Sequence, residues 1–230
     1  MIDKVFSDPD AAVADIPDGV TIMFGGFASA GSPTSLILAL QRQGTRDITG
    51  IANNIGLGDK LDVLCERRQL KKMIASFAIR ASGGRQSLFE QQYRAGGVEL
   101  EVVPQGTLAE RIRAAGAGIG GFYTRTGVGT PVAEGKEQRT FSGDEYLLEL
   151  PLFADYALIK AHRGDRMGNL TYHGSGRNFN VPMATAAIVV IAEVDEIVET
   201  GDLDPERVIT PGIYVDRIVV GERHQIRWLA

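Results

Sequence analysis

A glycine-rich segment near the N-terminus is the first stretch of this sequence that could bind a ligand. It runs from Asp18 through a predicted buried strand and then through Gly25, Gly26 and Gly31 to Pro33. Glycines let a backbone approach a ligand closely, and the first amides of a following helix can bind an anion or a carbonyl oxygen. The segment is not a nucleotide P-loop, because no Gly-Lys-Ser/Thr follows it. The alternative is a glycine-rich turn that binds nothing.

A second glycine pattern, Gly116-Ala-Gly118-Ile-Gly120-Gly121, matches the dinucleotide-binding fingerprint only in its letters. That fingerprint must follow a strand and begin a helix, whereas this pattern follows a predicted helix over Leu108–Ala115. We interpret it as the C-terminus of a helix that continues into a loop.

The other reactive side chains form no recognisable site. The three histidines, His162, His173 and His224, have no cysteine, glutamate or second histidine at metal-ligand spacing, so no metal site is expected. No Gly-x-Ser-x-Gly nucleophile elbow occurs. Cys65 follows Leu64 in an apolar, helix-like stretch, and we interpret it as a small buried side chain rather than a nucleophile.

Two hydrophobic periods alternate through the first half of the chain. Short apolar runs predict strands and amphipathic stretches predict helices, which favours βαβ units in a mainly parallel sheet. The predicted strands are Val20–Phe24, Ile48–Ile51, Met73–Phe77 and Val98–Val103, and the predicted helices are Ser35–Arg42, Leu61–Arg68 and Leu108–Ala115. Ser32 before Pro33 predicts a helix N-cap, and Thr107 with Glu110 predicts a capping box.

The second half predicts an antiparallel extension of that sheet. Tight turns of Gly, Asp and Asn join its short strands, and a helix and two more strands follow. The predicted elements are strands over Tyr146–Leu150, Tyr156–Ala161 and Leu170–Tyr172, a helix over Val181–Ala187, and strands over Ile188–Val194 and Ile213–Val215. Because no repeat, linker or composition break occurs, we expect one domain over residues 1–230. Its fold class is α/β, with an open, mainly parallel sheet flanked by helices and an antiparallel extension.

Composition argues against several classes of protein. The net charge is −5 and no Lys/Arg run alternates with aromatic residues, so a nucleic-acid-binding protein is not expected. No apolar stretch approaches the roughly 20 residues that a membrane span needs. The N-terminal residues lack the pattern of a signal peptide, and a single cysteine suits a reducing compartment. We therefore expect a cytoplasmic protein that does not bind membranes.

Longer stretches, spread nearly from end to end, match a known family. They include Gly25–Phe27 with Gly31 and Pro33, Asn53–Gly56, Glu99–Arg113, Gly116–Thr130, Glu134–Lys136, Ala157–Ala161, Gly164–Asn169 and Arg177–Met183. In these stretches the sequence resembles the A (alpha) subunit of the family I CoA-transferases. The resemblance implies transfer of CoA from an acyl-CoA to a free carboxylic acid, often a 3-oxo acid.

The same resemblance implies that this chain forms only part of an active site. The family's nucleophile is a glutamate that the B subunit carries in a Ser-Glu-Asn-Gly stretch, and no glutamate here precedes an asparagine. A B subunit should therefore supply the carboxylate that attacks the thioester, in an A2B2 complex. This chain would position the substrate and stabilise charge. No tightly bound cofactor is implied, because the CoA thioester is the substrate.

Several residues take expected roles from the matching motifs. Gln105 is expected to donate its side-chain amide to the oxyanion that forms at the thioester carbonyl; the alternative is a glutamine that caps a turn. Asn53 and Asn54 are expected to contact the substrate at the same sheet edge. The expected CoA-binding segment comprises Gly25, Gly26, Phe27, Ala28, Ser29, Ala30 and Gly31.

The acceptor acid is expected to be 3-oxoadipate, with succinyl-CoA as donor. The sequences of Arg94–Gly106 and Leu203–Ile213 are most similar to those of the family members that act on 3-oxoadipate. Arg80 and Arg85 stand where acetoacetate-type members carry a glutamate, which suits a second carboxylate on the acid. The alternatives are a succinyl-CoA:acetoacetate transferase and a non-catalytic CoA-ester-binding protein with the same fold.

Overall fold

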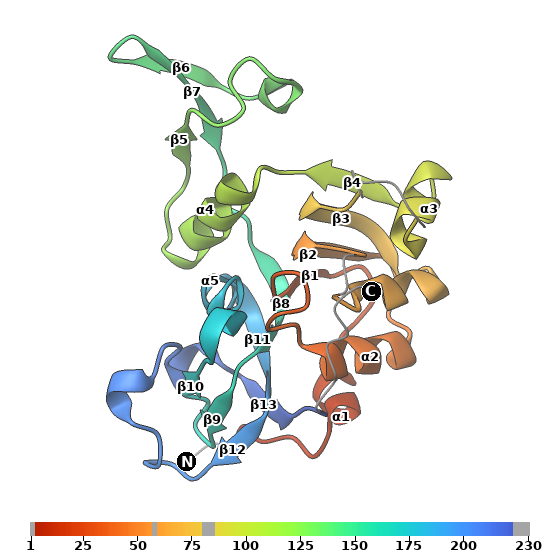
Figure 1. Cartoon of the computed structure of the whole chain (residues 1–230), viewed down its shortest axis with the longest axis vertical. Helices are drawn as coiled ribbons and strands as arrows, with labels where there is room; N and C mark the ends of the chain where they lie inside the picture. Colours follow the sequence, from red (N-terminus) through yellow and green to blue (C-terminus); the bar gives the residue numbers. More distant parts are fainter. Residues whose placement is uncertain (1–2, 57–58, 80–85, 223–230) are drawn as a thin grey trace.

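A seven-stranded sheet forms the centre of the molecule (Figure 1). The computed structural model describes residues 3–56, 59–79 and 86–222. Every neighbouring pair in the sheet is parallel. In spatial order the strands are β13 (Arg217–Val220), β11 (Ala187–Val194), β8 (Ala154–Lys160), β1 (Thr21–Phe24), β2 (Ile48–Asn54), β3 (Leu70–Phe77) and β4 (Glu99–Val102).

Helices cover both faces of this sheet, and the strands alternate between two hydrophobic clusters. Ile22 and Phe24 of β1 pack on one face, whereas Met23 packs on the other. The first face carries α1 (Pro9–Val13), α2 (Thr34–Gln43), the 3₁₀ helix η1 (Leu61–Arg67) and α3 (Leu88–Arg94). The second carries α4 (Gln105–Gly116) and α5 (Asn180–Met183). None of the helices within the described ranges is long and apolar enough to cross a bilayer.

Two small sheets extend from this core. An antiparallel arm, which projects beyond α4 at the top of Figure 1, consists of β5 (Phe122–Thr124), β6 (Gln138–Phe141) and β7 (Asp144–Glu149). A second sheet combines β9 (Arg163–Asp165), β10 (Leu170–Thr171) and β12 (Glu196–Val198). The short 3₁₀ helices are η2 (Pro131–Ala133), η3 (Gly174–Arg177), η4 (Pro205–Arg207) and η5 (Gly212–Tyr214).

The path of the chain reverses beside β1. From β1 the chain adds β2, β3 and β4 on one side, and it then returns to add β8, β11 and β13 on the other. Residues of β1 therefore pair with β2 and with β8, at Ala52 and Leu158 for Phe24. In open parallel sheets ligands bind at the carboxyl ends of strands at such a switch point.

The predicted fold class is confirmed, and the four strands of the first half form at their predicted places. One strand was placed in the wrong sheet. Tyr156–Ala161 was expected in the antiparallel extension, but β8 lies in the parallel sheet between β1 and β11. Ala157, Leu158 and Ile159 are fully buried, as in a strand that is covered on both faces.

Other element predictions were wrong in type or length. Ile213–Val215 is not a strand: Ile213 lies in η5 and is 86% exposed, and the strand forms instead at β13, whose Ile218 is buried. A helix forms at the predicted place over Leu61–Arg67, and it is of the 3₁₀ type, whereas the helix expected over Val181–Ala187 ends at Met183. The glycine pattern from Gly116 is confirmed as the end of a helix followed by a loop to β5.

Both predicted N-terminal caps were wrong. Helix α2 begins at Thr34 after Pro33, and the Ser32 hydroxyl instead donates to the Asp59 carbonyl at 2.9 Å. Helix α4 begins at Gln105, so Thr107 lies inside its first turn and cannot form a capping box. Its buried hydroxyl has no hydrogen-bond partner within the described part of the chain.

Cys65 is buried in η1, which confirms the structural interpretation of this residue. Burial and the nearby carboxylates of Asp62 and Asp59 raise the pKa of the thiol to about 12. Since the thiolate is the nucleophilic form, Cys65 is inert in the folded protein.

Candidate active site

The glycine-rich segment forms a tight turn at the carboxyl end of β1. Phe27 and Ala30 exchange two backbone hydrogen bonds, of 3.0 and 2.9 Å. Ala28, between them, has φ +50°, a conformation that costs a residue with a Cβ about 1–2 kcal/mol. The Oδ1 atom of Asn54 accepts a 2.7 Å hydrogen bond from the amide of Ala28 and so holds the turn against the end of β2.

Two glycines of this segment are required by packing inside the protein. A Cβ on Gly25 would lie 1.8 Å from Oδ1 of Asn180, and a Cβ on Gly31 would lie 2.8 Å from Nδ2 of the same side chain. Asn180 is fully buried, accepts from the Lys160 amide at 2.9 Å and donates to the Gly31 carbonyl at 2.9 Å. Close packing on Asn180 therefore accounts for Gly25. At Gly31 the Gly176 carbonyl oxygen, 2.7 Å from such a Cβ, and a φ of +68° also disfavour any other residue, whatever the turn binds.

Gln105 and the two asparagines meet at the carboxyl ends of the strands. Gln105 is the first residue of α4, and its Nε2 donates to Oδ1 of Asn53 at 2.7 Å. Nδ2 of Asn53 donates to Oδ1 of Asn54 at 2.7 Å, and Nδ2 of Asn54 donates to Oδ2 of Asp59 at 2.5 Å. We call Gln105, Asn53, Asn54 and Asp59 the amide chain. Asn53, Asn54 and Asp59 are buried, whereas Gln105 is half-buried at its end.

The structure thus brings together Gln105, Asn53, Asn54 and the predicted CoA-binding turn. Arg80 and Arg85 lie outside the described residues. The amide chain can stabilise a negative oxygen. Nε2 of Gln105 carries two hydrogens, one of which is bound by Asn53, and it lies where the dipole of α4 is positive.

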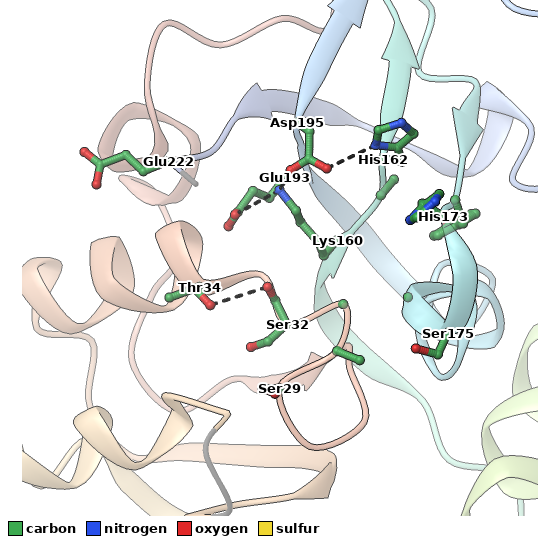
Figure 2. Close-up of a pocket in the computed structure, with 15 residues that line it drawn as sticks. Ser29, Ser32, Thr34, Lys160, His162, His173, Ser175, Glu193, Asp195 and Glu222 are labelled. Atoms are coloured by element: carbon green, nitrogen blue, oxygen red, sulfur yellow. Dashed lines mark hydrogen bonds and ion pairs between the residues drawn. The ribbon is translucent and has the colours of Figure 1, made fainter. Parts of the chain in front are cut away.

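A cavity of about 550 Å³ lies on the other side of the turn, at the switch point between β1 and β8 (Figure 2). Of the predicted site residues that the structure describes, Ser29, Ala30 and Gly31 line it. The other residues that line it come mainly from the ends of β8 and β11 and from the segment around η3. Those with polar side chains are Ser32, Thr34, Lys160, His162, Tyr172, His173, Ser175, Glu193, Asp195 and Glu222.

Charged groups at the wall of this cavity pair with one another. Figure 2 shows Lys160 beside Glu193 and Asp195, with Nζ–O distances of 3.3 and 2.8 Å. Burial raises the pKa of Glu193, and attraction to Lys160 offsets part of that effect. Burial also acts to raise the pKa of Asp195, but hydrogen bonds from Lys160 and His162 outweigh it and hold that pKa below its usual value. Because these groups pair with each other, we interpret them as a structural wall of the cavity.

Glu193 has a second role, because it caps helix α2. Its Oε2 accepts hydrogen bonds from the amides of Ser35 and Leu36 at 2.8 and 3.1 Å. A carboxylate at this position binds exposed N–H groups and complements the helix dipole.

Sequence reasoning missed Asn180, Asp59 and the residues at the ends of β8 and β11. The position of Lys160 and Glu193 at strand ends was the available signal, but it required knowing that both strands belong to the parallel sheet. In the described ranges no group of three or more His, Cys, Asp or Glu side chains is arranged to hold a metal ion.

The geometry can position a carbonyl group and stabilise negative charge on its oxygen, but the amide chain itself contains no well-placed nucleophile. Asp59 is the carboxylate of that chain, and it is 5% exposed. Its two oxygens accept hydrogen bonds from Asn54 and from the amide of Leu61 at 2.5 and 2.9 Å. Such a carboxylate is poorly placed to attack a substrate.

Comparison with known proteins connects this geometry to a family. The sequence model of the family described as Coenzyme A transferase matches residues 6–221. The chain is 54% identical over 220 residues to the A subunit of 3-oxoadipate CoA-transferase from Pseudomonas putida, covering 95% of this chain and 94% of that protein. It is 49% identical over 225 residues to the A subunit of a probable succinyl-CoA:3-ketoacid coenzyme A transferase from Bacillus subtilis, covering 97% and 92%.

The fold agrees with this assignment. The crystal structure of glutaconate coenzyme A-transferase from Acidaminococcus fermentans matches with a TM-score of 0.84 at 22% identity, covering 94% of this chain and 75% of that chain. At this identity the likeness concerns the fold alone. The nearly full-length match to the family model and the identities near 50% show that the chain belongs to the Coenzyme A transferase family.

Proposed function

We propose that this chain is the A subunit of a heteromeric CoA-transferase that moves CoA from succinyl-CoA to 3-oxoadipate. The observation that carries the proposal is the amide chain. It ends in the N–H donor of the half-buried Gln105 at the carboxyl ends of the strands, and it has no nucleophile of its own. A partner protein would supply the nucleophilic glutamate. The names of both relatives, each of which is one kind of subunit in a larger enzyme, support a partner of this kind.

In this mechanism the partner's glutamate attacks the thioester carbonyl of succinyl-CoA. The carbonyl oxygen becomes an oxyanion and accepts the second N–H of Gln105 Nε2, while the first remains bound to Asn53. The CoA thiolate then leaves, and an acyl anhydride remains on the glutamate. Attack of the thiolate on the glutamyl carbonyl releases succinate and leaves an enzyme-CoA thioester. The 3-oxo acid reverses these steps and departs as its CoA ester.

The hydrogen bond between Gln105 and Asn53 favours this role for Gln105 over turn capping. Nε2 of Gln105 donates to the buried Asn53 side chain rather than to a backbone carbonyl of its own turn. The donor is therefore held in place before the oxyanion forms, which is what electrostatic stabilisation of a transition state requires.

The experiment that tests the proposal combines the chain with its partner. We expect no CoA transfer from the purified chain alone, and transfer from succinyl-CoA to 3-oxoadipate after mixing with a B subunit that carries a Ser-Glu-Asn-Gly stretch. Native mass spectrometry should show an A2B2 complex. Transfer by the isolated chain would contradict the proposal that the partner supplies the nucleophile. Binding of CoA esters by a lone monomer, with no transfer in the presence of the partner, would favour a non-catalytic binding protein.

A succinyl-CoA:3-oxoacid transferase is the second candidate, because the Bacillus subtilis relative carries a name of that kind.

We propose that Arg80 or Arg85 binds the distal carboxylate of 3-oxoadipate through two parallel hydrogen bonds. Steady-state kinetics with 3-oxoadipate and acetoacetate should show a preference for the dicarboxylate. Arg80→Ala or Arg85→Ala should reduce that preference. A wild-type preference for acetoacetate would select the second candidate.

A further inference from the structure

The amide chain has a direction, which the carboxylate at its buried end and the Ala28 amide set together. An asparagine or glutamine side chain can turn over and exchange its donor and acceptor ends, because the oxygen and the NH₂ group are nearly equal in size. An ionised carboxylate can only accept hydrogen bonds. Asp59 accepts from Asn54 Nδ2 at 2.5 Å through one oxygen, and from the Leu61 amide at 2.9 Å and the Gly56 amide at 3.3 Å through the other.

This acceptor, together with the Ala28 amide that donates to the other end of the Asn54 side chain, determines the orientation of each amide that follows. Asn54 must turn its NH₂ group toward Asp59, so its oxygen faces Asn53 and the Ala28 amide. Asn53 must then turn its NH₂ group toward Asn54, so its own oxygen faces Gln105. Gln105 must finally present its NH₂ group, which donates one hydrogen to Asn53 at 2.7 Å and keeps a second for a ligand.

We propose that Asp59 is a positioning residue that orients the amide chain and thereby aims the second N–H of Gln105 at the oxyanion. This inference rests on the proposed function, which gives Gln105 its oxyanion. Asp59 also orders the glycine-rich turn, because its carbonyl accepts from the Ser32 hydroxyl at 2.9 Å and Asn54 holds the Ala28 amide at 2.7 Å. The carboxylate of Asp59 thus acts on the N–H donor and, through Asn54, on the expected CoA-binding turn, whereas the contact with Ser32 belongs to the backbone of Asp59.

Asp59→Asn is the direct test. If the new side-chain oxygen faces the Leu61 and Gly56 amides, the new NH₂ group opposes that of Asn54. Asn54 must then turn over or move aside, and either change costs it the hydrogen bond from the Ala28 amide. If Asn54 turns over, Asn53 and Gln105 turn over with it, and Gln105 presents its oxygen to Asn53. Misplacement of a catalytic donor costs about 100-fold in rate. We expect a fall of this order in kcat of the assembled A–B enzyme, with a smaller change in KM for succinyl-CoA.

A double substitution should restore the direction. In Asn54→Asp with Asp59→Asn, the carboxylate and the amide exchange places. The amide at position 59 then donates to the carboxylate at position 54, and its oxygen still accepts from the Leu61 and Gly56 amides. The carboxylate at position 54 accepts from Asn53 and Ala28, and the long 3.5 Å contact from Asn54 Nδ2 to the Ala28 carbonyl is lost. We expect the pair to recover kcat at least about tenfold over Asp59→Asn, a coupling that independent sites do not show.

Asp165→Asn is a matched control, because Asp165 is equally buried and accepts from an asparagine in the same way. Its Oδ2 accepts from Asn169 Nδ2 at 2.8 Å, and its Oδ1 accepts from the Met167 and Asn169 amides at 3.0 and 2.9 Å. It is the last residue of β9, and β9 and α4 lie in separate parts of Figure 1. We expect this variant to lower the melting temperature without lowering kcat.

Two results would overturn the inference: an unchanged kcat in Asp59→Asn, or a double variant no better than that single variant. Side-chain amide NMR of the isolated chain provides a readout that does not need activity. The NH₂ resonances of Asn53 should change their hydrogen-exchange protection in Asp59→Asn and regain it in the double variant. If the wild-type complex transfers no CoA, the proposed function fails, but the Asn53 resonances still decide whether Asp59 orients the amide chain. Unchanged protection in Asp59→Asn would refute that role of Asp59.

Discussion

At the scale of single residues, Gln105 is distinguished by what its amide does before any substrate binds. Its Nε2 is held by Asn53 Oδ1 at 2.7 Å, and its backbone begins helix α4. A donor fixed in this way loses little entropy when an oxyanion forms, so it stabilises the transition state more than the ground state.

We predict that Gln105→Ala lowers kcat of the assembled enzyme by a factor of about 10²–10³, or about 3–4 kcal/mol, while the complex still forms. KM should change less, because the hydrogen bond strengthens as the oxyanion develops. Steady-state kinetics and native mass spectrometry measure both quantities. Gln105→Glu is the matched variant, since it keeps the size of the side chain and removes its donor. A near-wild-type kcat in either variant would return Gln105 to a turn-capping role.

At the scale of elements, the glycine-rich turn between β1 and α2 is held from several sides. Asn180, at the start of α5, packs against Gly25 and Gly31, while Asn54 at the end of β2 holds the Ala28 amide. The conformation of the turn therefore depends on the packing of elements that are far apart in sequence.

We predict that Gly25→Ala destabilises the fold by about 1–3 kcal/mol, because its methyl group must displace the buried Asn180 side chain. Gly106→Ala is the control of opposite sign. A Cβ at Gly106 meets no atom within 4 Å, and alanine favours a helix over glycine by up to about 1 kcal/mol. Urea unfolding of the isolated chain measures both changes. Equal stability of the two variants would mean that Asn180 moves aside without cost.

At the scale of the whole molecule, ion pairs join segments that lie far apart along the chain. Arg217 of β13 binds Asp15 at 2.5 Å, Lys160 of β8 binds Asp195 at 2.8 Å, and Glu101 of β4 binds Lys72 of β3 at 2.6 Å. Glu101 also binds Arg111 of α4 at 3.1 Å. The pKa of each of these three carboxyl groups lies below its usual value.

Acid should therefore weaken the fold through these carboxylates. Burial acts to raise the pKa of Glu101, but hydrogen bonds from Lys72 and Arg111 outweigh it and lower that pKa from the usual 4.5. The unfolded chain then binds more protons near this pH, so the stability contributed by Glu101 is present above about pH 4.5 and is lost as the pH falls through the folded-state pKa.

We predict that Glu101→Gln makes the free energy of unfolding fall less steeply between about pH 5 and 3 than in the wild type. Urea titrations at several pH values measure the slope. Glu110→Gln is the control, because Glu110 forms an exposed pair with Arg113 inside α4 and such pairs contribute little. A wild-type slope in Glu101→Gln would show that this carboxylate does not couple folding to protons.

Much of this protein could be predicted from its sequence. Runs of apolar residues placed the strands of the first half within a few residues and favoured a parallel sheet, because hydrophobic period and turn residues act over short distances. Position at strand ends, together with the family motifs, predicted that Gln105, Asn53 and Asn54 share one edge. They do, at 2.7 Å between Gln105 and Asn53.

The remaining features follow from contacts between distant segments. The N-terminus of α2 is capped by Glu193, 158 residues from Ser35, although Ser32 is the better local cap. Asn180 explains Gly25, and Asp59 helps to orient the amide chain, yet no local pattern marks either residue. The turn residues that follow β8 are typical of a hairpin, but β8 pairs with β1 and β11 in the parallel sheet. Such choices depend on which buried polar groups meet after the sheet closes, and this is a property of packing between segments rather than of any segment alone.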